Sequence, residues 1–206
     1  MRQTRQTTQT RQNSASVWLD QTGENPFDQG FQEGILGKVN DLAEPPRLIG
    51  PTTDVRESFL AGEWASCIED GSPTAWLEPA RDDFAAFVAE RSGVRERWGV
   101  PCTTFWYVSG EQYIGTLIIR HALTPELTEI GGHIGYHVVP AWRRRGHATR
   151  MLAAGLVESR RLGLDRVLLT CAADNEPSRR VIVANGGVPA GRVRGEDRFW
   201  IDLLSV

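Results

Sequence analysis

The clearest repeat along the chain is a helical one between residues 148 and 162. Small or apolar residues occupy successive positions of one helical face, namely Ala148, Met151, Leu152, Gly155 and Leu156. Charged residues fill much of the other face, and a glycine that can end a helix follows at position 163. This pattern predicts an amphipathic helix from Ala148 to Leu162 that lays one face on a core.

Before residue 140 the pattern predicts two helices followed by a strand meander. The helices are expected at residues 53–62 and 78–98. A short strand is expected at residues 47–49, a hairpin is expected from residues 103–108 and 113–121, and a third strand runs from about Glu129 to Val139. Ser109-Gly110-Glu111-Gln112 supplies the turn of the hairpin, and Pro140 stops the third strand.

After residue 162 strands and helices alternate. Arg166–Cys171 reads as a buried strand, Asn175 as the N-cap of a second helix, and residues 188–193 and 199–203 as two closing strands. An antiparallel meander that leads into a strand–helix–strand–helix unit belongs to the α+β class.

The first 44 residues differ from the rest in composition. Residues 1–13 hold neither an acid nor an apolar period, so they cannot form a packed core, although an arginine-rich start also resembles an organelle transit peptide. We expect residues 1–44 to be a disordered or weakly docked tail and residues 45–206 to be one domain. The sequence offers neither a membrane span nor an apolar signal, which predicts a cytoplasmic protein without a membrane partner.

Charge and cysteine content narrow the function. Residues 41–100 carry twelve acids and six bases, whereas residues 101–206 carry ten acids and thirteen bases. A local basic region in an acidic protein suits a small anionic ligand better than a nucleic acid, so we expect no nucleic-acid partner. The three scattered cysteines form neither a disulfide framework nor a zinc knuckle, and we expect core thiols and no metal.

The candidate chemistry lies between the third strand and the long helix. The loop reads Trp142-Arg143-Arg144-Arg145-Gly146-His147-Ala148-Thr149. A helix N-terminus leaves backbone N–H groups unpaired, its dipole favours negative charge, and the glycine permits close approach. This segment therefore predicts a pyrophosphate site, and a solvated basic loop is the alternative.

Three motifs in order resemble the GNAT (Gcn5-related N-acetyltransferase) superfamily. Arg143-x-x-Gly146-x-Ala148 resembles the Gln/Arg-x-x-Gly-x-Gly/Ala motif, Ile134-Gly135-Tyr136 the strand before it, and Asn175-Glu176-Pro177-Ser178 the start of the next helix. The resemblance implies a GNAT fold with a mixed, mostly antiparallel sheet that splays into a V between helices. It also implies transfer of an acetyl group from acetyl-CoA to a primary amine of a small molecule or peptide.

The resemblance further implies which residues hold acetyl-CoA. The main chain of Val138 and Val139 would bind the pantetheine arm, with an oxyanion held by an N–H near Val139. Asn175 and Ser178 would lie beside the thiol end. The pyrophosphate would be held by the segment Arg143, Arg144, Arg145, Gly146, His147, Ala148 and Thr149.

Two residues are candidates for the catalytic base. His133 stands where the family usually has a glutamate base, and Glu129 is the alternative. Ile182 replaces the tyrosine that often serves as the acid, which leaves a catalytically weak acyl-CoA sensor as the second hypothesis. The acids of residues 41–100 favour a cationic acceptor, and a homodimer is compatible with the sequence.

Overall fold

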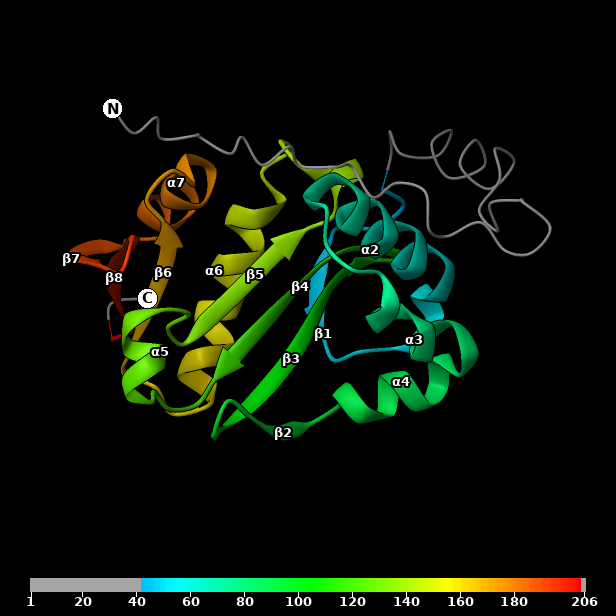
Figure 1. The fold of residues 1–206 in the computed structure, drawn as a ribbon, viewed down its shortest axis with the longest axis horizontal. Coiled ribbons are helices and arrows are strands. Elements are labelled where there is room, and N and C mark those ends of the chain that lie inside the picture. Colours follow the sequence, from blue (N-terminus) through cyan, green and yellow to red (C-terminus); the bar gives the residue numbers. More distant parts are fainter. Residues whose placement is uncertain (1–41, 205–206) are drawn as a thin grey trace, which may run out of the picture. The chain divides into compact units, whose positions relative to one another are not determined.

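The computed structural model describes residues 42–204 (Figure 1). The expected tail of residues 1–44 falls almost wholly outside this range, so the domain boundary stays a prediction. Among the helices of the described range, none combines the length and the apolar character that crossing a membrane requires.

Within residues 42–204 the first sheet contains five strands, all in antiparallel pairs. They are β1 (Arg47–Ile49), β2 (Val94–Arg97), β3 (Val100–Ser109), β4 (Gln112–Arg120) and β5 (Ile134–Val138). The order is β1-β3-β4-β5, and β2 pairs with another part of β3. The predicted hairpin is confirmed, since Gly110 turns with φ +54° between β3 and β4.

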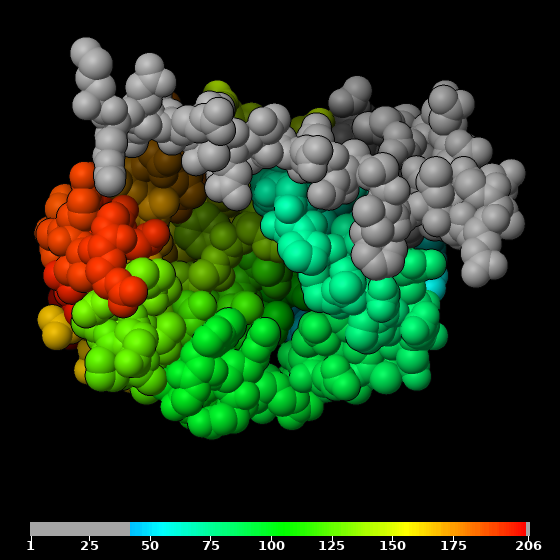
Figure 2. Space-filling view, in the orientation of Figure 1, coloured from blue at the N-terminus to red at the C-terminus, as the bar shows by residue number. Residues whose placement is uncertain are grey.

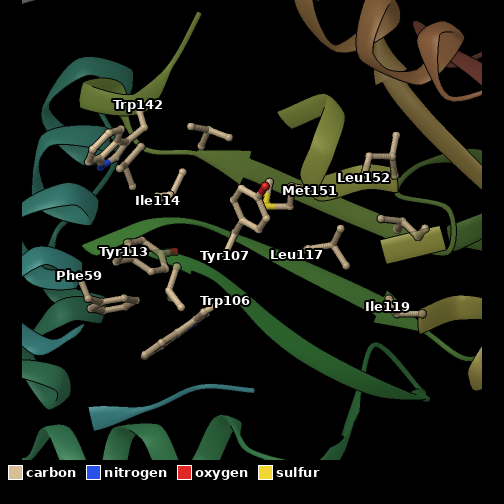
Figure 3. Close-up of a cluster of buried hydrophobic side chains, with 14 of the residues drawn as sticks. Phe59, Trp106, Tyr107, Tyr113, Ile114, Leu117, Ile119, Trp142, Met151 and Leu152 are labelled. Carbon is tan, nitrogen blue, oxygen red and sulfur yellow. The ribbon is translucent and has the colours of Figure 1, made fainter. Parts of the chain in front are cut away.

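Helices α2 (Arg56–Asp70), α3 (Glu78–Asp82) and α4 (Phe84–Arg91) gather at one end of this sheet (Figure 1). A cluster of aromatic side chains holds α2 and α4 against the sheet. The Phe59 ring of α2 lies 4.7 Å from Trp106 of β3 and 4.9 Å from Tyr113 of β4 (Figure 3). Phe84 and Phe87 of α4 each lie 5.5 Å from the same ring. Large buried rings of this kind contribute much of the hydrophobic stabilisation of a core.

Helix α6 (His147–Arg161) confirms the amphipathic prediction and packs against β4 and β5. Met151 and Leu152 on its apolar face are fully buried. Gly155 allows a close approach, because a Cβ at this position would lie 2.5 Å from the Leu117 side chain of β4. The glycine is therefore part of the packing surface.

The second sheet has the order β6-β8-β7 and follows the first along the chain. Its strands are β6 (Arg166–Ala172), β7 (Val188–Val193) and β8 (Glu196–Asp202), and α7 (Glu176–Ala184) connects β6 to β7. A short α5 (Pro125–Glu129) precedes β5, and 3₁₀ turns occupy Thr53–Val55, Ala75–Leu77 and Pro140–Trp142. The architecture confirms the predicted α+β class.

Strands β5 and β6 run in the same general direction and diverge (Figure 1). They belong to different sheets and come together just before β5, where the His133 N–H donates to the Leu168 carbonyl at 2.7 Å. The two sheets therefore enclose a V whose apex lies at His133 and whose mouth lies at the ends of β5 and β6.

Two predicted elements are wrong. Residues 78–98 are not one helix, because Asp83 caps a new helix with its side chain and the chain leaves the helical conformation after Arg91 to form β2. The third strand does not begin at Glu129, because Thr124 caps α5 and Pro125 starts it. The first helix also runs eight residues further than expected, to Asp70.

Candidate functional site

The N-terminus of α6 lies in the loop that follows β5. Gly146 is its N-cap with φ +75°, a conformation that glycine adopts without strain. The N–H groups of His147, Ala148 and Thr149 form the first turn and have no acceptor within the helix. Gly146 is exposed, as are Arg144 and Arg145 before it. The predicted loop thus presents unpaired donors and positive charge together, as an anion site requires.

Arg143 orders this loop. Its Nε donates to the Val138 carbonyl at 2.8 Å, and its Nη1 donates to Glu69 of α2 at 2.5 Å. The side chain thus ties the end of β5 and α2 to the loop. His147 faces the core, where burial and two nearby arginines lower its pKa. The backbone N–H of His147 therefore suits an anion, whereas its side chain does not.

The backbone of β5 alternates between β4 and the V. Val139 donates to Ile114 at 3.0 Å and Arg120 donates to His133 at 2.7 Å, which fixes the residues that bond to β4. By the antiparallel pattern, the N–H and C=O groups of Tyr136 and Val138 point away from β4, toward the V, and of these the Val138 carbonyl is taken by Arg143. The Val139 N–H is engaged in the sheet, so the N–H that suits an oxyanion is that of Val138.

His133 lies buried at the apex of the V. Its Nδ1 accepts a hydrogen bond from the Leu168 N–H at 2.9 Å, and its ring lies 6.1 Å from Trp200. Burial, with Arg120 and Arg166 nearby, lowers the pKa of His133 to about 4. A general base needs access to the acceptor and a pKa near the working pH, so the burial and the lowered pKa of His133 do not favour it as the base.

Glu129 stands apart from β5. It ends α5, is substantially exposed and pairs with Arg194 at 3.2 Å. The roles of His133 and Glu129 stay predictions of the sequence.

Helix α7 borders the V at the end of β6. Asn175 is its N-cap and accepts from the Ser178 N–H at 3.1 Å. The Ser178 hydroxyl lies 3.0 Å from the Tyr136 hydroxyl of β5. The helix that follows β6 therefore also contacts β5. Burial raises the pKa of Tyr136 to about 12. Ile182 is fully buried, which explains how an apolar residue fits that position.

The sheet face that α2 leaves uncovered is recessed. Figure 2 shows a hollow between α2 in cyan and the C-terminal elements in orange and red, with green strands at its floor. His137 of β5 lies on the α2 side of the sheet, where its Nε2 lies 2.9 Å from Glu63 of α2. The sequence analysis missed this pair. The only sequence signal for this pair was the two-residue repeat of β5, which places alternate side chains on the same face of the sheet.

The sequence comparison gives the family. The profile of the acetyltransferase (GNAT) domain matches residues 53–188. The chain belongs to this family. It is therefore an acetyltransferase, as the motifs predicted. No curated protein sequence matches the chain.

Solved GNAT structures share the fold. RimJ of Mycobacterium smegmatis, solved with CoA-disulfide, is 21% identical over 80% of this chain and 85% of its own, with a TM-score of 0.56. The microcin C7 self-immunity acetyltransferase MccE, solved with acetyl-CoA and AMP, is 15% identical over 80% and 94%, with a TM-score of 0.53. A Salmonella typhimurium acetyltransferase that modifies the N-terminal serine of ribosomal protein L7/L12 is 14% identical over 79% and 97%, also at 0.53.

A second feature of this GNAT domain lies near the recess. A cavity of about 180 Å³ is lined by Glu90, Arg91, Arg95, Arg97 and Thr104. Thr104 pairs with Ile118, which pairs with Gly135, two residues from His137. The cavity and His137 therefore lie on the same face of the sheet, roughly 12 Å apart by strand geometry. Its lining thus includes three arginines, two of which, Arg91 and Arg95, also donate to backbone carbonyls of α4.

Proposed function

We propose that the protein transfers the acetyl group of acetyl-CoA to a primary amine of a small molecule or peptide by direct attack in a ternary complex. The N-terminus of α6 is the observation that carries the cosubstrate half of this proposal. Its unpaired N–H groups, with Arg144 and Arg145 beside them, suit the pyrophosphate. The V next to it presents strand backbone, which suits the amide-bearing pantetheine arm.

Acetyl-CoA supplies an activated acyl carbon, and the residues of this chain hold and orient it. The Val138 N–H faces the V and suits the carbonyl oxygen of the thioester, where negative charge develops during attack. Ser178 and Tyr136 lie at the other wall of the V. A thiolate is a good leaving group, with a pKa of order 8.5, so transfer does not require the tyrosine that Ile182 replaces.

The acceptor side favours an amine that also carries an acidic group. Of the acids in residues 41–100, Glu63 is buried, Glu69 pairs with Arg143, and Asp83 caps α4. The cavity near the recess instead holds three arginines and one glutamate. The cationic acceptor that the charge count favoured stays the alternative. A cytoplasmic location and a homodimer stay predictions.

The test of the cosubstrate site compares Gly146→Asp with Gly146→Asn. Both substitutions add a side chain of the same shape at the same positive φ, so they differ in charge alone. We expect the aspartate variant to bind CoA at least about tenfold more weakly than the asparagine variant, because like charges a few ångströms apart repel by more than about 1.4 kcal/mol. Isothermal calorimetry measures both affinities.

Gly110→Asp is the matched control, since Gly110 also has a positive φ and its turn is open. It should bind CoA as the wild type does. Equal affinity of the aspartate and asparagine variants at position 146 would remove this loop from the pyrophosphate site.

The sensor alternative rests on Ile182, whose buried side chain offers no acid. Thiol release from acetyl-CoA with a panel of amines separates the two functions. An acetyltransferase releases thiol in proportion to added amine, whereas a sensor binds CoA and releases none.

A further inference from the structure

A carboxylate is buried between α2 and the sheet. Glu63 is 3% exposed and one of its oxygens, Oε1, accepts a short hydrogen bond from the Tyr113 hydroxyl of β4. Burial next to this carboxylate raises the pKa of Tyr113 well above its usual value. The phenol therefore stays protonated and keeps donating. A buried carboxylate is costly to desolvate and needs such partners. A second partner of Glu63 lies on β5.

That second partner is His137. Its Nε2 is buried and lies 2.9 Å from the same Glu63 oxygen, although the N–H is not aligned for a regular hydrogen bond. The contact is thus a close approach of the ring to the carboxylate, and it leaves Nδ1 as the ring nitrogen that does not contact Glu63. The side chain as a whole is 38% exposed, so the face of the ring away from Glu63 is accessible. Among the described titratable groups, Glu63 of α2 contacts the ring, and Tyr113 of β4 bonds to the same carboxylate oxygen.

The position of His137 in β5 relates it to both substrates. Its side chain lies on the recessed face of the sheet. The next residue, Val138, directs its N–H into the V. Consecutive residues of a strand are about 3.3 Å apart. An amine that enters from the recess therefore meets His137 beside the strand edge that suits the thioester.

We propose that His137 is the general base of the transfer and that Glu63, held by Tyr113, is its positioning residue. This inference rests on the proposed function. His137 accepts a proton from the acceptor ammonium through Nδ1, and the neutral amine then forms the C–N bond with the acetyl carbon. The C–S bond breaks and its electron pair stays on sulfur. The amide nitrogen loses a second proton, which the thiolate takes, and His137 returns the first proton to solvent.

The test measures the pH dependence of kcat/KM for His137→Gln, with spermidine and with a short seryl peptide as acceptors. We expect a loss of about 10²-fold at pH 7, the usual scale for a general base. The loss should shrink as the pH passes the pKa of the acceptor, near 8 for the peptide amine and near 10 for the polyamine, because the amine then needs no base. Calorimetric affinity for acetyl-CoA should stay at the wild-type value.

Two further variants test the positioning role. Glu63→Gln removes the charge at nearly constant shape and should lower kcat/KM about tenfold, with the same recovery at high pH. Tyr113→Phe keeps the ring of the aromatic cluster and should give a smaller defect of the same form. His121→Gln is the control, since this histidine bonds to Thr103 at the far end of β4 and should leave kcat/KM and its pH profile unchanged.

A pH-independent defect in His137→Gln would overturn the proposal, since it would indicate a structural role. Wild-type turnover in that variant would also overturn it. If the wild type binds CoA but releases thiol with neither probe, the proposed transfer itself fails and the inference with it. That result concerns the wild type alone, so it is distinguishable from a failure of the base assignment.

Discussion

His133 offers the sharpest test of how the V is held together. His133→Ala removes the Nδ1 acceptor and leaves the backbone N–H of Leu168, a residue that is 1% exposed, without its partner. An unsatisfied buried donor costs about 1–3 kcal/mol, and the lost packing of the ring on Trp200 adds about 1 kcal/mol. We therefore expect the free energy of unfolding at pH 7.5 to fall by about 2–4 kcal/mol.

The same site predicts how stability varies with pH. The pKa of His133 is lowered to about 4 in the folded protein, against about 6.5 in an unfolded chain. Between these values the unfolded state binds the proton and the folded state does not. The stabilisation is therefore complete above pH 6.5 and is lost as the pH falls toward 4. With partial screening by solvent, this contribution amounts to about 2 kcal/mol.

The assay is urea unfolding followed by tryptophan fluorescence at pH 7.5 and 4.5. The gap between wild type and His133→Ala should narrow by about 2 kcal/mol at the lower pH, because the wild type alone loses this contribution. His133→Asn is the control, since its Oδ1 can replace Nδ1 as acceptor but does not titrate. A constant gap would refute the reasoning. A stable His133→Ala whose turnover is lost at pH 7 and recovers at high pH would instead restore His133 as the base.

Two further predictions concern the acceptor cavity and α7. Arg97→Ala should raise the KM of acidic acceptors about tenfold at 20 mM salt and much less at 300 mM, while the KM of spermidine stays unchanged; the opposite preference would restore a cationic acceptor. Asn175→Ala removes the N-cap of α7 and should lower the melting temperature by roughly 2–4 °C, as calorimetry measures, because a cap contributes about 1 kcal/mol. An unchanged melting temperature would mean that the cap is dispensable.

The sequence predicted the features that depend on neighbouring residues. The α6 helix and the loop before it follow from a local apolar period and a glycine, so both are found where expected. The caps at Asp83 and Thr124 are also local signals. They were outweighed by the apolar period of residues 78–98 and by the β-rich residues after 129. Because Thr124 starts a helix, Glu129 lies at the end of α5 and not in the expected strand.

The catalytic face could not be read from the sequence, because it joins distant segments. Glu63 interrupts an amphipathic helix and reads as a solvated acid, yet the fold buries it against β5. His133 and His137 carry the same chemical group. Only the partner of each ring, the Leu168 N–H in one case and the Glu63 carboxylate in the other, separates a structural histidine from a reactive one.

The V has a consequence for aggregation as well as for ligand binding. A strand edge with unpaired backbone groups, such as that of β5, is a template on which another chain can assemble and aggregate. Here β6 stands opposite and joins β5 at His133, so the exposed edge faces its own domain. The opposing wall of β6 therefore hinders pairing of a second polypeptide strand with this edge. By joining the two strands at the apex, His133 thus also protects the domain against aggregation through the β5 edge.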